Sequence, residues 1–270
     1  MKSFVHTLPG GATLQAYLHE EICGSDGQLW GPRPAVILCP GGGYAFTSPR
    51  EADPPAFLFL NMGLQVFILH YRVGEQAGKL QPMEDLARSI LLVRERCSEW
   101  EIDPDRVAVM GFSAGAHLAC SLGVHWDDEE LARRCEVKEV RRLRPDAMIL
   151  AYPVITAGTF AHRKSIELVS ADSGRPQEYW SLETQVNDQT PPAFLWHTMD
   201  DAGVPVENSF LLAQALHKAG VECECHLFPS GCHGMSVCTG EVYTPSATVG
   251  MWVPLCKNWL EHRFGPLGGL

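Results

Sequence analysis

Residues 111–115 read G-F-S-A-G and place a serine between two glycines. This G-x-S-x-G motif follows a strand-like run at 106–110 and precedes a helical pattern that begins near Ala114. In such a strand–turn–helix elbow, flanking side chains would clash, and the serine Oγ is exposed over the carboxyl end of the sheet. The start of the helix also offers the N–H of Ala114 to a developing anion. The motif therefore predicts that Ser113 is a nucleophile, because an ordinary N-cap serine would not require both glycines.

A serine hydroxyl needs a base at neutral pH, and His233 is the histidine best placed to act as one. It lies in the small-residue segment S-G-C-H-G at 230–234, directly after the last strand-like run at 222–228. In enzymes with this serine elbow, the chain order is serine, acid, histidine. We therefore predict that His233 is the base and that most other histidines are solvated or structural.

Two adjacent carboxylates, Asp200 and Asp201, follow the strand-like run at 193–196 and lie between the serine and the histidine in the chain. One carboxylate is enough to orient the imidazole of His233. Both aspartates follow the same strand, so the strand alone does not choose between them.

The segment 40–44, P-G-G-G-Y, follows an apolar run at 35–39. Three glycines let the backbone turn its N–H groups towards a ligand without a side chain in the way. Such a loop can cradle a phosphate, but neither G-x-G-x-x-G nor G-x-x-x-x-G-K-[ST] is present. With Ser113 downstream, the loop is interpreted as the second part of an oxyanion hole.

A group of cysteines and histidines near the C-terminus offers a metal-binding alternative. Its members are Cys223, Cys225, His226, Cys232 and His233. No C-x-x-C pair occurs, and Cys223 and Cys225 alternate along a strand-like run, so the spacing argues against zinc. We expect the chemistry to need no metal and no organic cofactor.

The elements that must position these residues alternate between short apolar runs and helical patterns. Strands are predicted at 35–39, 65–70, 106–110, 147–151, 193–196 and 222–228, and helices at 55–62, 82–100, 114–124, 205–219 and 249–264. This alternation predicts an α/β fold, with a mostly parallel sheet and helices on both faces. We expect residues 1–270 to form a single domain.

Two stretches interrupt the alternation. Residues 125–144 are charged and are predicted to be helical in part. Residues 155–192 are polar and separate two strands of the predicted sheet. An insertion at such a place forms either a small cap over an active site or a surface excursion, and both interpretations stay open.

The composition is that of an ordinary globular protein, with 46% hydrophobic and 20% charged residues. The 21 basic and 32 acidic residues give a net charge of −11, without a basic stripe, so nucleic acid and anionic membranes are not expected partners. No apolar run approaches the roughly 18 residues of a membrane helix. The absence of a secretory signal and ten scattered cysteines favour a cytoplasmic location.

Together these motifs resemble the α/β-hydrolase superfamily and, within it, the small bacterial acetylxylan and carbohydrate esterases. The resemblance rests on P-G-G-G-Y at 40–44, D-P-D-R-V at 103–107, G-F-S-A-G-A-H-L-A at 111–119, H-T-M-D-D-x-x-V-P-V at 197–206 and C-H-G-M at 232–235. It extends from about residue 35 to the C-terminal helix. One position departs from the pattern, because related lipase-like esterases have histidine where this chain has Pro40.

The resemblance implies a catalytic triad of Ser113, Asp201 and His233. Asp201 is selected because the acid of the family stands four residues before the proline, which is Pro205 here. The resemblance also implies an oxyanion hole formed by the backbone N–H groups of Gly42, Gly43 and Ala114.

The expected activity is a two-step serine carboxylesterase with a small-molecule ester as substrate. The resemblance suggests short acyl groups, acetyl above all, on carbohydrate esters such as acetylated xylo-oligosaccharides. Two alternatives stay open. One is another acyl hydrolase on the same fold, namely a thioesterase, an arylformamidase or a peptidase. The other is a non-catalytic binding protein of hydrolase fold.

Overall fold

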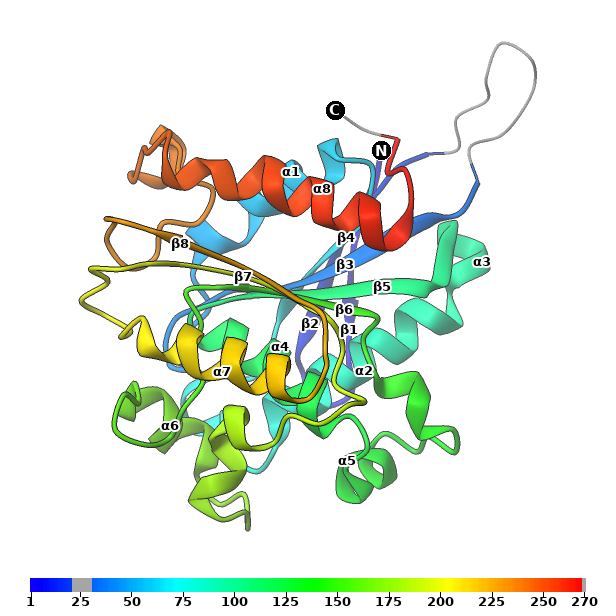
Figure 1. The fold of residues 1–270 in the computed structure, drawn as a ribbon. Helices are drawn as coiled ribbons and strands as arrows, with labels where there is room; N and C mark the ends of the chain where they lie inside the picture. Colours follow the sequence, from blue (N-terminus) through cyan, green and yellow to red (C-terminus); the bar gives the residue numbers. More distant parts are fainter. Residues whose placement is uncertain (21–30, 269–270) are drawn as a thin grey trace.

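The computed structural model describes residues 1–20 and 31–268, and this part of the chain is built on an eight-stranded sheet (Figure 1). The strand order is β1-β2-β4-β3-β5-β6-β7-β8. Strands β3 to β8 pair in parallel, whereas β2 is antiparallel to both β1 and β4. The bounds are β1 Lys2–Thr7, β2 Thr13–Leu18, β3 Arg33–Cys39, β4 Gln65–His70, β5 Ile102–Phe112, β6 Ala147–Ala151, β7 Ala193–Thr198 and β8 Cys223–Phe228.

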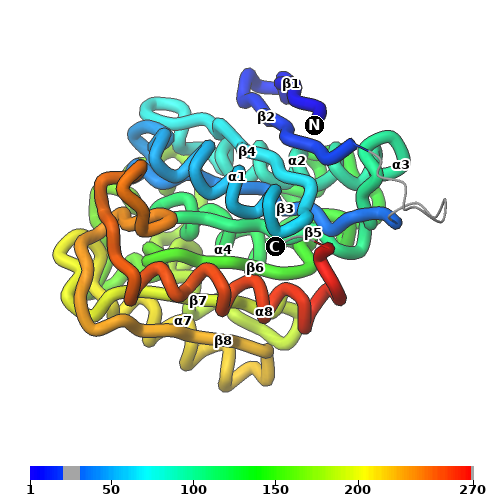
Figure 2. Tube along the Cα trace, turned by 90° about the horizontal axis from the view of Figure 1, so that it is seen from above, coloured from blue at the N-terminus to red at the C-terminus, as the bar shows by residue number. Residues whose placement is uncertain are grey.

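Helices cover both faces of this sheet. Helices α1 and α8 pack on one face, and α2, α4 and α7 pack on the other (Figures 1 and 2). The bounds are α1 Asp53–Asn61, α2 Gln81–Glu95, α3 Cys97–Trp100, α4 Ala114–His125, α5 Glu129–Arg134, α6 Arg163–Ser170, α7 Glu207–Lys218 and α8 Trp252–Phe264. The predicted mostly parallel sheet with helices on both faces is therefore confirmed.

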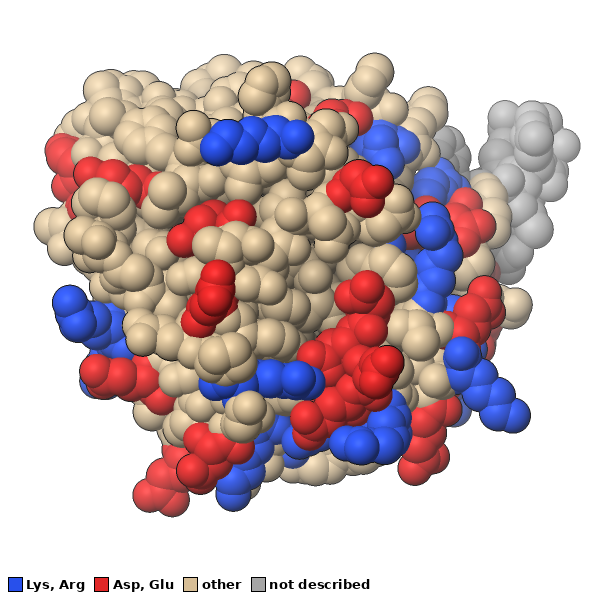
Figure 3. All heavy atoms as spheres, turned by 60° about the horizontal axis from the view of Figure 1, so that its bottom comes forward, with Lys and Arg blue, Asp and Glu red and all other residues tan. Residues whose placement is uncertain are grey.

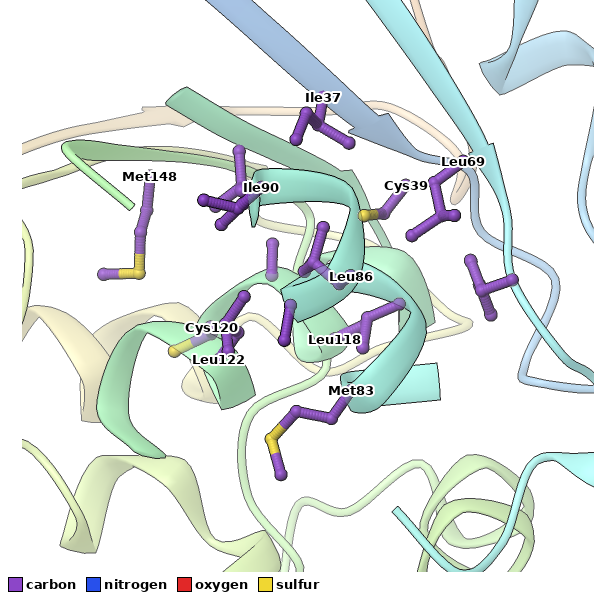
Figure 4. Close-up of a cluster of buried hydrophobic side chains, with 14 of the residues drawn as sticks. Ile37, Cys39, Leu69, Met83, Leu86, Ile90, Leu118, Cys120, Leu122 and Met148 are labelled. Atoms are coloured by element: carbon purple, nitrogen blue, oxygen red, sulfur yellow. The ribbon is translucent and has the colours of Figure 1, made fainter. Parts of the chain in front are cut away.

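Successive side chains of a strand point to opposite sides of the sheet. Because helices cover both sides, both sets of side chains of the central strands are buried. In β5, Val109 belongs to the core under α2 and α4, whereas Met110 belongs to the core under α1 and α8. Figure 4 shows part of the first core, to which Ile37 of β3, Leu86 of α2 and Leu118 of α4 all belong. This packing holds the carboxyl end of β5, and with it the serine elbow, in a fixed place.

All six predicted strands are present. The structure differs from the prediction in two places, the strands before residue 35 and the helix over 82–100. No strand was predicted before residue 35, although β2 alternates, with Leu14, Ala16 and Leu18 buried on one face. The single helix predicted over 82–100 is wrong, because the chain leaves helical geometry at Arg96 (φ −97°, ψ 12°). The short helix α3 that follows brings Trp100 against the sheet.

Residues 155–192 fold as α6 and two short 3₁₀ helices, η4 Gln177–Trp180 and η5 Leu182–Thr184, beside α4 and α7. The Asn208 Oδ1 of α7 accepts hydrogen bonds from the N–H groups of Ile155 and Thr156, at 2.8 and 3.0 Å. From α4, the ring of His125 stacks on Tyr179 with 3.7 Å between centroids. The insertion is thus held by both helices that it contacts.

His117 is a fully buried histidine that joins α4 to this insertion. Its Nε2–H donates to the carbonyl of Trp180 at 3.3 Å, which leaves Nδ1 to accept from the Tyr44 hydroxyl at 3.0 Å. Burial lowers its pKa from 6.5 to about 4. The neutral form is therefore the one that the folded protein accommodates.

We expect the free energy of unfolding to fall by roughly 2 kcal/mol between about pH 7 and pH 5 through His117 alone. The unfolded chain binds a proton near pH 6.5 and the folded chain only near pH 4, so this stability is present above pH 6.5 and is lost on acidification. Urea unfolding at several pH values measures it. Glutamine in His117→Gln also offers an N–H donor and an acceptor but does not titrate, so the stability of this variant should depend less on pH. An identical pH dependence in the wild type and the variant would contradict the assignment.

Acidic and basic side chains lie interspersed over the face of the molecule seen in Figure 3. Arg175 of the insertion pairs with Asp128 at the start of α5, at 2.7 Å. No helix in the described ranges is long and apolar enough to cross a membrane. The expected cytoplasmic location and the absence of nucleic-acid partners stay predictions.

Candidate active site

Ser113 occupies a sharp turn between β5 and α4. Its backbone has φ 54° and ψ −117°, a left-handed conformation that non-glycine residues rarely adopt outside functional sites. The flanking positions must be glycine, because a Cβ at either would clash with nearby backbone atoms. A Cβ at Gly111 would lie 2.1 Å from the carbonyl oxygen of Gly115, and one at Gly115 would lie 2.0 Å from that of Cys39. The steric reason for the motif is therefore present in the structure.

His233 lies opposite the serine, in the loop after β8. The Ser113 hydroxyl donates to Nε2 of His233 at 2.8 Å, and Nδ1–H donates to Oδ2 of Asp201 at 2.7 Å. Room for the imidazole comes from Gly203, where a Cβ would approach the His233 side chain to 2.9 Å. The structure thus brings the three residues together in one chain of hydrogen bonds.

Asp201 has a fully buried carboxylate with four hydrogen-bond donors. Its Oδ1 accepts from the N–H groups of Gly203 and Val204, at 2.8 and 2.9 Å. Its Oδ2 accepts from His233 and, at 3.2 Å, from Nε2 of His197. Burial works to raise the pKa of Asp201, but the hydrogen bonds from His197, His233 and Val204 outweigh it and hold the pKa well below its usual range.

His197 was not identified from the sequence as part of the site. It is the penultimate residue of β7, is fully buried, and is fixed on its other ring nitrogen by Ser209 Oγ at 2.8 Å. The signal for its role was its place four residues before the acid, at the end of a strand. It thus contacts the same carboxylate oxygen, Oδ2 of Asp201, as His233 does.

Asp200 makes different contacts from Asp201. Its carboxylate is exposed and accepts from the Ser230 hydroxyl and from the N–H of Gly231, both at 2.7 Å. These two donors lower its pKa. Asp200 therefore holds the loop that carries His233, while Asp201 contacts the imidazole itself.

The glycine loop lies directly beside the serine. A Cβ at Gly41 would be 2.8 Å from the carbonyl oxygen of Phe112 and 3.1 Å from Cβ of Ser113, so a larger residue there would displace the backbone. Gly42 and Gly43 have φ values of 128° and 64°, which only glycine adopts without strain. Over residues 1–20 and 31–268, the N–H groups of Gly42, Gly43 and Ala114 donate to no protein acceptor. They are available to a ligand bound at Ser113.

Glu51 is a second residue that the sequence analysis did not single out. It ends the 3₁₀ helix η1 (Pro49–Glu51), and only 4% of it is exposed. Its Oε2 accepts from the N–H of Gly41 at 2.9 Å. A single glutamate in the segment S-P-R-E at 48–51 gives no sequence signal for such a contact.

The alternative metal-binding group is not assembled around His233, which is engaged with the serine and the aspartate. His226 instead contacts Glu224 at 2.7 Å. Among the residues with described coordinates, no three His, Cys, Asp or Glu side chains are grouped as metal ligands.

Comparisons with known proteins agree with this fold. The BD-FAE family profile matches residues 27–216. The chain is 37% identical over 236 residues to endo-1,4-beta-xylanase B of Butyrivibrio fibrisolvens, covering 86% of this chain and 36% of that protein. It is 30% identical over 240 residues to the acetylxylan esterase of Xylanibacter ruminicola, covering 86% and 46%. The chain thus spans less than half the length of these two curated relatives.

Two solved structures are similar over nearly the whole chain. One is the acetyl ester-xyloside bifunctional hydrolase from Caldicellulosiruptor lactoaceticus, with 36% identity, a TM-score of 0.79 and coverage of 94% of this chain and 89% of that one. The other is the carboxylesterase Cest-2923 from Lactobacillus plantarum WCFS1, with 28% identity, a TM-score of 0.86 and full coverage of both chains. These similarities show an α/β-hydrolase fold.

Proposed function

We propose that this chain, which belongs to the BD-FAE family of α/β-hydrolase esterases, is a serine carboxylesterase. It would release short acyl groups from carbohydrate esters. The observation that carries this proposal is the continuous hydrogen-bond chain from Ser113 through His233 to Asp201. A serine with a base and an orienting acid, next to free backbone N–H groups, is the arrangement that acyl transfer requires.

In the first step, Ser113 Oγ attacks the ester carbonyl carbon while its proton passes to Nε2 of His233. The electron pair of the carbonyl moves to its oxygen, and the N–H groups of Gly42, Gly43 and Ala114 stabilise the resulting oxyanion. The negative charge of Asp201 stabilises the imidazolium that forms and keeps Nδ1 protonated.

The tetrahedral intermediate then collapses. The bond from carbon to the alcohol oxygen breaks, and the imidazolium of His233 gives its proton to the leaving alcohol. Water attacks the acyl-enzyme in the same way, with His233 as base, and releases the carboxylic acid and free Ser113. The chemistry requires only groups that this chain supplies.

The proposed substrates are acetylated sugars such as xylo-oligosaccharides. This choice is supported by the names of the relatives, which include an acetylxylan esterase and an acetyl ester-xyloside hydrolase. The solved structure of the latter matches 94% of this chain with a TM-score of 0.79, which supports the choice of substrate class.

We further propose that residues 1–270 form one domain, with residues 155–192 as a cap beside the site. Two side chains at the start of α6 support the cap. Cε1 of His162 and Oγ of Ser165 would lie 3.8 and 3.7 Å from a Cβ on Gly43. Burial, and then the charge of His233, lowers the pKa of His162, as expected for a histidine close to the reacting groups.

Short acyl chains are expected to be the best substrates, because the cap lies against the glycine loop and no long apolar insertion is available to line an acyl tunnel. A panel of p-nitrophenyl esters, from acetate to octanoate, should show kcat/KM falling by about tenfold or more, which is roughly 1.4 kcal/mol of transition-state stabilisation. Acetylated xylo-oligosaccharides, an acyl thioester and an N-formyl arylamine complete the panel. A higher kcat/KM for the octanoate ester than for the acetate ester would contradict the acetylesterase assignment. A higher kcat/KM for the acyl thioester or the N-formyl arylamine than for the acetate ester would also contradict it.

A further inference from the structure

Glu51 is a buried carboxylate that the proposed mechanism does not use. Its Oε2 accepts from the N–H of Gly41, and its Oε1 accepts from the hydroxyl of Tyr152 at 2.7 Å. Both donors are neutral, and in the described part of the chain Glu51 joins no ion pair. Burial raises its pKa, and the two hydrogen bonds oppose that increase. A buried carboxyl group without a cation costs stability that an apolar side chain would not.

The position of Glu51 explains why this cost is retained. A Cβ on Gly41 would be 2.6 Å from Oε2 of Glu51 and 3.1 Å from Cβ of Ser113, so carboxylate, loop and nucleophile are in close contact. Three successive glycines have large backbone freedom, which an external tie removes. The hydrogen bond to Gly41 is such a tie, immediately before Gly42 and Gly43, whose N–H groups are the proposed oxyanion donors.

The second oxygen of Glu51 reaches the other side of the site through Tyr152. This residue follows β6 with φ 36°, and its hydroxyl accepts from the N–H of Ser236 at 2.9 Å. Its ring meets the ring of His233 edge-on, with 5.1 Å between centroids. The neighbouring Arg50 donates from Nη2 to the carbonyl of Gly234 at 2.9 Å. The 3₁₀ helix η1 therefore contacts both the glycine loop and the histidine loop.

We propose that Glu51 is a positioning residue that fixes the glycine loop relative to Ser113 and His233. It acts through Gly41, so that the N–H groups of Gly42 and Gly43 are already oriented when the oxyanion forms. Preorganised donors stabilise the transition state more than the bound substrate, so their misplacement lowers kcat more than it raises KM. This inference rests on the proposed serine-esterase function.

Three substitutions separate the reach of the side chain from its charge. Glu51→Gln keeps an acceptor for Gly41 and removes the charge, so kcat for p-nitrophenyl acetate should stay within about tenfold of the wild type. Glu51→Leu fills a similar volume without an acceptor, and kcat should fall by about 100-fold, with KM within about threefold. Glu51→Asp keeps the charge but is too short to span both donors, so its kcat should be lower than that of Glu51→Gln.

Asp146 provides a matched control at the opposite end of the sheet. It also accepts a backbone hydrogen bond, from Val107 N–H at 2.9 Å, and it pairs with Arg94. Asp146→Asn should lower the melting temperature but leave kcat unchanged. The esterase function is tested separately: the wild type should hydrolyse p-nitrophenyl acetate, and Ser113→Ala should not. If this test fails, the inference about Glu51 also falls, because it rests on the esterase function.

Two results would overturn the role of Glu51 while the esterase function stands. The first is a Glu51→Leu protein that melts at a lower temperature but keeps its kcat, which would make Glu51 merely structural. The second is a higher kcat for Glu51→Asp than for Glu51→Gln, which would mean that charge rather than reach matters. The second comparison decides the question even where the leucine variant does not fold.

Discussion

Replacing Ser113 by alanine is expected to lower kcat for p-nitrophenyl acetate by about 10⁴-fold or more. The substitution removes the atom that attacks the carbonyl and the hydroxyl that donates to His233 at 2.8 Å. The glycine loop and Ala114 remain, so some stabilisation of the oxyanion is retained, and substrate binding should change little. Initial rates at saturating substrate measure the effect.

The folded state should tolerate this change. Ser113 already has a positive φ of 54° as a non-glycine residue, and alanine has the same Cβ in the same place. Circular dichroism and thermal melting are therefore expected to match the wild type. A fluorophosphonate should label the wild type and not the variant. Near-normal ester hydrolysis by Ser113→Ala would rule out the serine mechanism.

The serine elbow could be predicted because its requirements are local. Gly111 and Gly115 have no space for a Cβ, and both contacts are made with backbone atoms that any sequence would place there. The glycine loop is similar, since the positive φ values of Gly42 and Gly43 restrict the residue type. Patterns of this kind follow from the backbone path alone. They can be recognised without knowledge of distant contacts.

The supporting residues could not be predicted, because their contacts join distant parts of the chain. Tyr152 and Glu51 are 101 positions apart, and a lone glutamate in a sequence ordinarily indicates a solvated surface. His197 was assigned to a strand end, but its contact with Asp201 depends on how the following turn folds back. Strands β1 and β2 were missed for a different reason, since K-S-F-V-H-T and T-L-Q-A-Y-L contain more polar residues than a central strand such as A-M-I-L-A.

The choice between Asp200 and Asp201 shows the same limit within two residues. The strand before them predicts the location of the acid but not which carboxylate turns inward. The turn decides this, because Gly203 and Val204 direct their N–H groups at Oδ1 of Asp201 and leave Oδ2 for His233. The family resemblance selected Asp201, and the geometry of the turn supplies a physical reason for that choice.

Asp201→Asn is therefore expected to lower kcat by on the order of 10⁴-fold. The amide oxygen can still accept from Gly203 and Val204, so the turn should keep its shape. The amide nitrogen then faces Nδ1 of His233 as a donor, which favours the tautomer protonated on Nε2. That tautomer cannot take the proton of Ser113. Steady-state rates with p-nitrophenyl acetate measure the loss.

Asp200→Asn is the matched control, with the same change of charge one residue earlier. Its amide oxygen can accept from Gly231 N–H and its nitrogen can donate to the Ser230 hydroxyl, so the histidine loop keeps both of its ties to this residue. Because Asp200 does not touch the imidazole, kcat should stay within about tenfold of the wild type, about 1.4 kcal/mol in the barrier. If Asp200→Asn were the more damaging of the two, the orienting acid would have to be reassigned to Asp200, and the buried carboxylate of Asp201 would be left with a structural role.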